Sequence, residues 1–280
     1  MKNFAIFVIG SLLMTVGVAQ ASPLYITQYN GTSGAIVETD TGAIIDTFTT
    51  TVSSETGIAV NGTVRIIPAF AQTSGSEYDL SGNVINNGIY DNPEYNSLYD
   101  GTTDGQYNYS IDHNGSYRVL RFDLNWQNGA TLFTPALRSS GITYDALSNT
   151  LWITTSPNDG APNGNIQQFS MTGELISEFS TAAIGGNHYG LAFDSTDGTL
   201  WTSDYQGSTL SQFDTSGNLL KEIDMSALGF TDFFGLEFNL GGAFEGTLAP
   251  VPVLSNWMLL LLVLIIGFAG LKAGRKRLAA

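Results

Sequence analysis

The side chains best suited to proton transfer are the two histidines, His113 and His188. His188 follows Gly185-Gly186-Asn187 and precedes an apolar strand expected over Gly190–Phe193, which places it at the mouth of a central channel. There it could serve as a general base or metal ligand, or as a loop histidine with a local hydrogen bond, and we favour the loop role. His113 lies in Asp112-His113-Asn114-Gly115, a sequence typical of a hairpin turn, so we expect it to be structural.

Other catalytic and metal-binding patterns are weak. The chain has no G-x-S-x-G elbow, and neither histidine has a recognisable serine partner. The complete absence of cysteine excludes disulfides, cysteine nucleophiles and cysteine-ligated zinc. Calcium is the one cofactor for which the sequence offers candidates, namely Asp159, Asp232 and Glu237.

Each calcium candidate has a plainer alternative. Asp159 lies in an oxygen-rich loop over 156–165 that lacks the spacing of a calcium loop, so a turn insertion is the simpler interpretation. Asp232 and Glu237 could face the channel, but nearby positions in other strands carry Thr143 and Ala192, which do not complete a ring of ligands. The aspartates that end inner strands, Asp100, Asp145 and Asp194, are expected to accept backbone N–H bonds in turns.

The charge distribution restricts the partners. All 25 acidic residues lie between the two apolar ends of the chain, together with only five basic ones, which gives this region a net charge of −20 against −15 for the whole chain. Such a surface repels phosphate backbones and anionic lipid headgroups. We therefore expect no nucleic-acid partner.

An internal repeat indicates the architecture that positions these residues. The segment Gly141–Trp152 (GITYDALSNTLW) matches Gly190–Trp201 (GLAFDSTDGTLW), and Gln168–Phe179 matches Gln212–Ile223. Each unit contains four short strands joined by polar turns, which is the content of one propeller blade. A β-sandwich also has many short strands, but its strands do not normally repeat as a four-strand unit. Trp152 and Trp201 are then expected to lie in the core between blades.

The repeat predicts an all-β, five-bladed β-propeller. Innermost strands are expected near residues 57, 98, 141, 190 and 235, with Tyr99–Gly105 aligned on Phe193–Gly198. Leu24–Phe48 supplies three strands of a blade and lacks the innermost one. Gly235–Phe238 supplies that missing strand from the other end, so the ring closes by pairing the two ends of the domain.

The two ends of the chain predict export. Residues 1–21 show the basic start, apolar run and Ala19-Gln20-Ala21 site of a signal peptide, expected to be helical and cleaved by signal peptidase. Residues 22–248 form the propeller domain. Residues 249–280 contain an apolar stretch of transmembrane length, about 254–271, followed by a basic tail that should stay cytoplasmic.

Two family resemblances follow from these motifs. The repeating unit resembles blades of the NHL and virginiamycin B lyase-like propellers. The segment Val251-Pro-Val-Leu-Ser-Asn-Trp257 with its apolar run and Arg-Lys-Arg is similar to the IPTL-CTERM sorting signal, a relative of PEP-CTERM. Val251 and Val253 depart from that family's usual Ile and Thr. The residues that fit the motif are Pro252, Leu254, Ser255 and Trp257.

The sorting resemblance implies processing by an exosortase-type membrane peptidase. The expected route passes through an inner-membrane intermediate, with the C-terminus cytoplasmic, to the cell surface or extracellular matrix. The sequence favours a non-catalytic module there that binds polysaccharide or another protein. The alternative is a secreted lyase or hydrolase with a site around His188.

Overall fold

The computed structural model describes residues 22–92, 94–114, 116–156, 164–185, 188–204 and 207–240. Within these ranges the chain forms twenty strands and a single 3-10 turn, Ser226–Leu228. None of the described helical segments is long and apolar enough to cross a membrane. The expected signal peptide, the sorting motif with Pro252, Leu254, Ser255 and Trp257, and the apolar stretch 254–271 lie outside the described residues.

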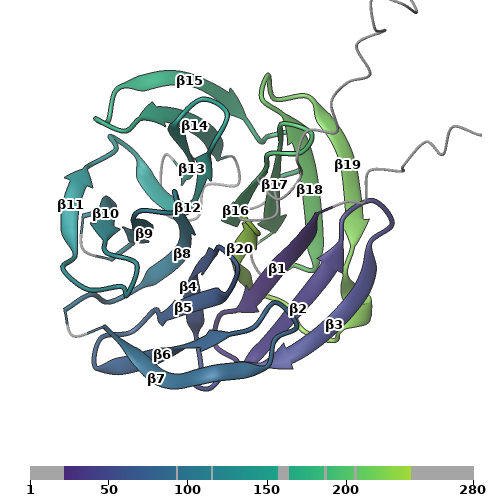
Figure 1. Cartoon of the computed structure of the whole chain (residues 1–280). Helices are drawn as coiled ribbons and strands as arrows, with labels where there is room; N and C mark the ends of the chain where they lie inside the picture. Colours follow the sequence, from purple (N-terminus) through teal and green to yellow (C-terminus); the bar gives the residue numbers. More distant parts are fainter. Residues whose placement is uncertain are drawn as a thin grey trace, which may run out of the picture.

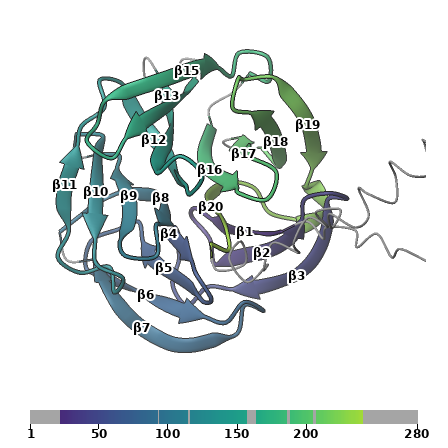
Figure 2. The same ribbon diagram turned by 45° about the horizontal axis from the view of Figure 1, so that its top comes forward.

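Five four-stranded antiparallel sheets surround a common axis, so the expected five-bladed propeller is confirmed (Figures 1 and 2). From the innermost to the outermost strand the sheets are β20(Phe233–Phe238)-β1(Pro23–Gln28)-β2(Ser33–Glu38)-β3(Ala43–Thr49), β4(Glu55–Val60)-β5(Val64–Pro68)-β6(Thr73–Tyr78)-β7(Val84–Asn92), β8(Leu98–Thr103)-β9(Asn108–Asp112)-β10(Arg118–Phe122)-β11(Ala130–Phe133), β12(Arg138–Asp145)-β13(Thr150–Ser156)-β14(Asn165–Ser170)-β15(Leu175–Ser180) and β16(His188–Asp194)-β17(Thr199–Asp204)-β18(Thr209–Asp214)-β19(Leu219–Asp224).

The ring closes as the sequence predicts. Strand β20 pairs antiparallel with β1, with Leu24 opposite Phe238 and Thr27 opposite Gly235. The last described strand therefore supplies the innermost position of the sheet that begins the domain (Figure 1). This pairing gives β1 a partner on each side, so its inner edge is not left open.

The hydrophobic core is divided among the five blade interfaces. Trp152 and Ile166 of one sheet, for example, pack with Leu191 and Phe193 of the next. Trp201 lies in the following interface and, like Trp152, is 1% exposed. The prediction that both tryptophans belong to the inter-blade core is confirmed.

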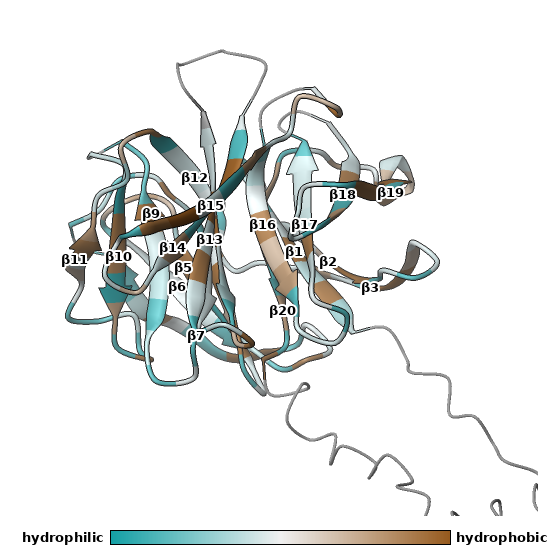
Figure 3. Cartoon of the chain, turned by 90° about the horizontal axis from the view of Figure 1, so that it is seen from above, coloured by the Kyte–Doolittle hydropathy of each residue, from teal (hydrophilic) through white to brown (hydrophobic). Residues whose placement is uncertain are grey.

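The outermost strands β15 and β19 also contain hydrophobic residues, which are brown in Figure 3. Ile176 and Leu220 in these strands are about half exposed, because an outermost strand has no further sheet to cover its outer face. The innermost strands β4 and β20 are instead buried along their whole length. Burial increases from the rim of the ring toward its axis.

Every innermost strand carries one extra residue relative to its neighbour, a β-bulge, and this fixes the equivalent positions. Counted from the bulge, Asp100 is equivalent to Gly141 and Gly190, and Asp104 to Asp145 and Asp194. The alignment of Tyr99–Gly105 on Phe193–Gly198 was therefore wrong, because it was guided by the short Asp…Asp-Gly pattern instead of by the bulge. Asp100 does not end its strand.

Candidate functional site

The carboxylate of Asp100 lies on the axis of the ring and joins four strands from four sheets. Its Oδ1 accepts hydrogen bonds from the backbone N–H groups of Gly101 (2.9 Å) and Leu236 (3.1 Å). Its Oδ2 accepts from Ile142 (3.1 Å) and Leu191 (2.8 Å). The side chain is fully buried. The expectation that Asp100 is a turn acceptor is wrong, since it closes the centre of the channel.

Glycines in the other sheets let the innermost strands approach one another closely around this carboxylate. The positions equivalent to Asp100 are Gly57, Gly141, Gly190 and Gly235. A Cβ atom on Gly141 would lie 2.8 Å from the carbonyl oxygen of Tyr189, so the backbones of neighbouring sheets are in contact there. Burial raises the pKa of the Asp100 carboxyl well above its usual range, and the four N–H donors oppose that rise.

Asp145 and Asp194 have the turn role expected of them. Oδ1 of Asp145 accepts from the backbone N–H groups of Leu147 and Ser148, and Asp194 accepts from Thr196. In the sheet of Asp100 this role belongs to Asp104, which accepts from the N–H groups of residues 106 and 107.

Glu237 faces the axis two residues beyond the glycine position, as predicted. Its Oε1 accepts the N–H of Phe238 at 2.9 Å, and Thr102 and Thr143 lie beside it in the neighbouring strands. Burial raises the pKa of Glu237 well above its usual range, while the Phe238 N–H and the two threonine hydroxyls lower it. This layer therefore holds one carboxyl among hydroxyls.

A cluster of aromatic rings covers the other end of the axis, where the innermost strands begin. Tyr29 stacks on Phe234 with ring centroids 4.4 Å apart, and Tyr189 stacks on Phe234 at 4.8 Å. Tyr99 contacts all three of these rings. Phe70 contacts Tyr29 at the rim and is 38% exposed. We call this cluster the aromatic mouth: Tyr29, Phe70, Tyr99, His113, Tyr189 and Phe234.

His113 lies in the hairpin between β9 and β10, as predicted, but its ring is fully buried in the aromatic mouth. It stacks on Tyr99 at 4.2 Å. Nδ1 donates to the carbonyl oxygen of Ser139 (2.8 Å), because Nε2 faces the Arg138 guanidinium, which can only donate (2.9 Å). Burial first, and then the Arg138 charge, lower the pKa of His113 to about 4, against the opposing Ser139 hydrogen bond. The ring is neutral at physiological pH.

The structure places His188 at the start of β16, where both of its ring nitrogens contact backbone carbonyl oxygens. Nδ1 lies 3.2 Å from Ser203 O, and Nε2 lies 2.7 Å from Gly185 O. Burial lowers the pKa of His188, and the two carbonyls and the Asp204 charge raise it. A neutral imidazole has one N–H, so the ring donates to one of these carbonyls and contacts the other, which places it between Gly185 and Ser203.

The calcium candidates do not converge. Asp159 lies outside the described residues. Asp232 precedes β20 at the aromatic mouth, and Glu237 lies near the opposite end of the same strand. Among the described residues no group of three or more histidine or acidic side chains is arranged to hold a metal ion.

Neither the aromatic mouth nor the buried Asp100 carboxylate on the axis was predicted as a site. The one signal that could have identified the axial carboxylate is an aspartate at a position where the four other innermost strands have glycine. The mouth carries a similar signal, since Tyr99, Tyr189 and Phe234 all lie just before or at the bulge.

Comparison with known proteins supports the fold. No family model matches the chain, and no curated protein matches its sequence. A chain of the nidogen/laminin complex has a TM-score of 0.53 and 14% identity, over 79% of this chain and 99% of that one. AztD from Citrobacter koseri in its apo form matches 78% of this chain and 98% of its own, with 10% identity and a TM-score of 0.42. At such identity the nidogen/laminin likeness shows a shared fold.

Proposed function

We propose that this chain is an interaction module that binds a glycan or a protein through the aromatic mouth. The observation that carries the proposal is the group of stacked rings gathered from several sheets at one end of the axis. Half-buried tyrosines present an apolar ring and a polar hydroxyl, which suits them to binding surfaces. Asp100 closes the channel beneath them, so a ligand would rest on the mouth and not pass through the ring.

Two further considerations support binding. A chain of this fold occurs in the nidogen/laminin complex, so the fold is compatible with holding a partner, although fold alone does not assign function. The strongly acidic composition disfavours nucleic acid and anionic membranes as that partner. Of the two remaining classes we take a glycan as the first to test, with a protein ligand as the other outcome.

The test is a binding screen of the detergent-solubilised full chain against immobilised glycans and envelope proteins, with and without Ca²⁺. Phe70→Ala removes the most exposed ring of the mouth and should weaken binding about fivefold or more. Leu147→Ala is the matched control, since Leu147 is 68% exposed in the turn after β12, at the opposite end of the axis. Equal binding by both variants would contradict the proposal.

We also propose that the domain is exported and sorted through its tail. The support is the sequence alone: the signal-like segment 1–21 and the motif with Pro252, Leu254, Ser255 and Trp257 before an apolar stretch and a basic end. Signal peptidase and an exosortase-type peptidase would then be processing partners. Mass spectrometry of the surface-located protein should find a C-terminus upstream of residue 258, and recovery of intact Lys272–Ala280 peptides would contradict processing.

A further inference from the structure

The turn between the two outer strands has a glycine in the left-handed region in four of the five sheets, and the remaining sheet breaks this pattern. In the first sheet this glycine is Gly42, at φ 73°. In three other sheets φ is 81° for Gly82, 86° for Gly173 and 87° for Gly217. A Cβ atom there would lie 2.6 Å from a phenylalanine in the outermost strand of the preceding sheet. The glycine therefore lets an aromatic side chain seal the gap between two blades.

The sheet β8–β11 has Trp126 at this position. Asp123 opens the turn and accepts from the N–H groups of Asn125 and Gln127, both at 2.9 Å, as Asp79 does from residues 81 and 83. Trp126 has φ 56°, a conformation that residues with a side chain disfavour, and it is only 1% exposed. A bulky residue held in a glycine conformation calls for an explanation beyond the turn itself.

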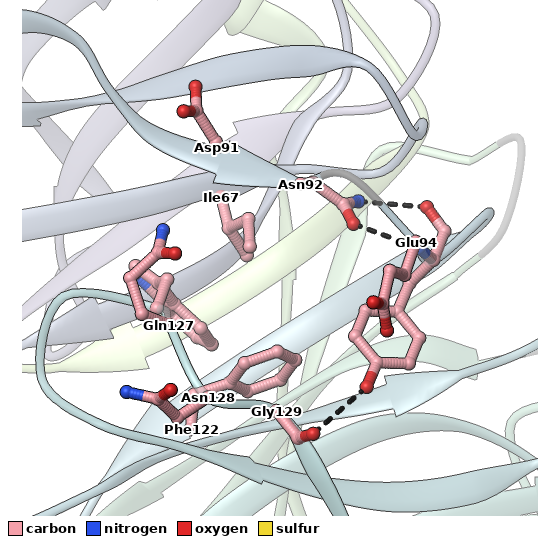
Figure 4. A pocket seen from close by; sticks show the side chains of 10 residues that line it. Ile67, Asp91, Asn92, Glu94, Phe122, Gln127, Asn128 and Gly129 are labelled. Carbon is pink, nitrogen blue, oxygen red and sulfur yellow. Dashed lines mark hydrogen bonds between the residues drawn. The ribbon is translucent and has the colours of Figure 1, made fainter.

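A cavity of about 240 Å³ opens beside this turn, between the sheets β4–β7 and β8–β11 (Figure 4). Its buried apolar side consists of Ile67, Phe122 and Trp126. The rings of Phe122 and Trp126 meet edge to face at 5.4 Å. The volume lies below the roughly 300–1,000 Å³ typical of sites for drug-sized ligands, so it suits a single ring.

Tyr95 forms a wall of the cavity and is fixed on three sides. Its hydroxyl donates to the carbonyl oxygen of Gly129 (3.2 Å), and its backbone N–H donates to Oδ1 of the buried Asn92 (3.0 Å). Its ring meets Phe122 edge to face at 5.6 Å. Figure 4 shows these bonds as dashed lines. The wall is therefore formed before any ligand arrives, which lowers the entropy lost on binding.

The polar lining has a defined chemistry. Asp91 and Glu94 are the charged side chains of the cavity, and no lining residue is basic. Gln127 presents an exposed amide at the edge of the turn (Figure 4). The indole N–H of Trp126 is buried and has no hydrogen-bond partner within the described part of the chain. The nitrogen has almost no exposed surface, so an oxygen of a ligand reaches it only when the indole shifts toward the cavity.

We infer that this cavity, which we call the side pocket, binds one pyranose unit of a glycan that carries no negative charge. A C–H face of a pyranose would pack on the half-buried ring of Tyr95, and its hydroxyls would bond to Asp91, Glu94 and Gln127. One ring or hydroxyl oxygen would accept the Trp126 N–H. The two carboxylates disfavour uronic acids and favour neutral or amino sugars. The inference rests on the proposed binding function but places this contact away from the aromatic mouth.

Isothermal titration of the detergent-solubilised full chain tests the side pocket with four tetrasaccharides: cellotetraose, N-acetylchitotetraose, glucosamine tetramer and tetragalacturonate. We expect saturable binding of at least one of the first three and none of tetragalacturonate. Trp126→Phe removes the unpartnered N–H, and Gln127→Ala removes an exposed amide without touching the core. Each should weaken binding about fivefold, the value of one hydrogen bond.

Glu174→Ala is the matched control for Gln127→Ala, because Glu174 is exposed and follows the turn glycine of another blade. It should leave binding unchanged. Binding that is insensitive to both pocket variants but lost in Phe70→Ala would refute the side pocket and keep the proposed function of the mouth. The reverse pattern would support the pocket and contradict the mouth. No saturable binding, or equal binding of tetragalacturonate, would overturn the inference.

Discussion

Replacing Asp100 by asparagine should destabilise the whole ring, because each carboxylate oxygen accepts two backbone N–H groups. An asparagine keeps the shape but has one oxygen and one NH₂ group. Whichever way the amide turns, two buried N–H groups lose their acceptor and face another donor. At about 1–3 kcal/mol for each such group, the free energy of unfolding should fall by roughly 2–6 kcal/mol. Removal of a buried charge offsets part of this loss.

Urea unfolding of the full chain in detergent, followed by tryptophan fluorescence, measures the change. Trp152 and Trp201 are buried between blades and report loss of the ring. The midpoint should fall while the dependence on urea stays the same. Asp123→Asn is the matched control. Its Oδ1 takes both backbone donors of an exposed turn, so an amide oxygen can replace it and the change should stay within about 0.5 kcal/mol.

The reasoning would be refuted if Asp100→Asn were as stable as the parent chain or more stable. The cost of burying the charge would then exceed the value of the four donors. A loss equal to that of Asp123→Asn would refute it equally, since it would mean that the axis is no more sensitive than an exposed turn.

Three further predictions concern the ring. Burial raises the pKa of Glu55 to about 7 from an ordinary value near 4.5. The contribution of Glu55 to the free energy of unfolding is therefore complete below about pH 4.5 and is lost as the pH rises through 7, by up to about 3 kcal/mol. Glu55→Gln should abolish this pH dependence of the free energy of unfolding, measured by urea titrations at several pH values. Gly141→Ala should cost roughly 1–3 kcal/mol in the same assay, because the new methyl meets the Tyr189 carbonyl at 2.8 Å. Deleting residues 235–240 should abolish cooperative unfolding, and a variant that kept a sharp transition would contradict closure through β20 and β1.

The blade count and the closure were predictable because they depend on patterns that repeat. Leu24–Phe48 has three strands and Gly235–Phe238 has one, so the missing pieces fit only each other. Trp152 and Trp201 occupy matching places in two units, which identified them as core. A ring built from repeats shows its architecture several times over in one sequence.

The candidate sites were harder to predict because they lie where the repeat is broken. Asp100 replaces a glycine, but a misaligned strand concealed the substitution until the bulge fixed the register. Trp126 replaces a turn glycine, and only its backbone conformation and the cavity beside it reveal the difference. His113 appeared to be a turn residue and is one, yet its burial under Tyr99 depends on how two sheets meet.

The direction of β20 has a mechanical consequence. The strand runs from the aromatic mouth to the opposite end of the axis, and its last residue, Phe238, pairs with Leu24 at that far end. Tension applied between a partner held at the mouth and the C-terminal side of Phe238 would therefore act along the strand. It would load the β20–β1 hydrogen bonds together in shear instead of peeling them one at a time, the geometry in which a short ladder resists force best.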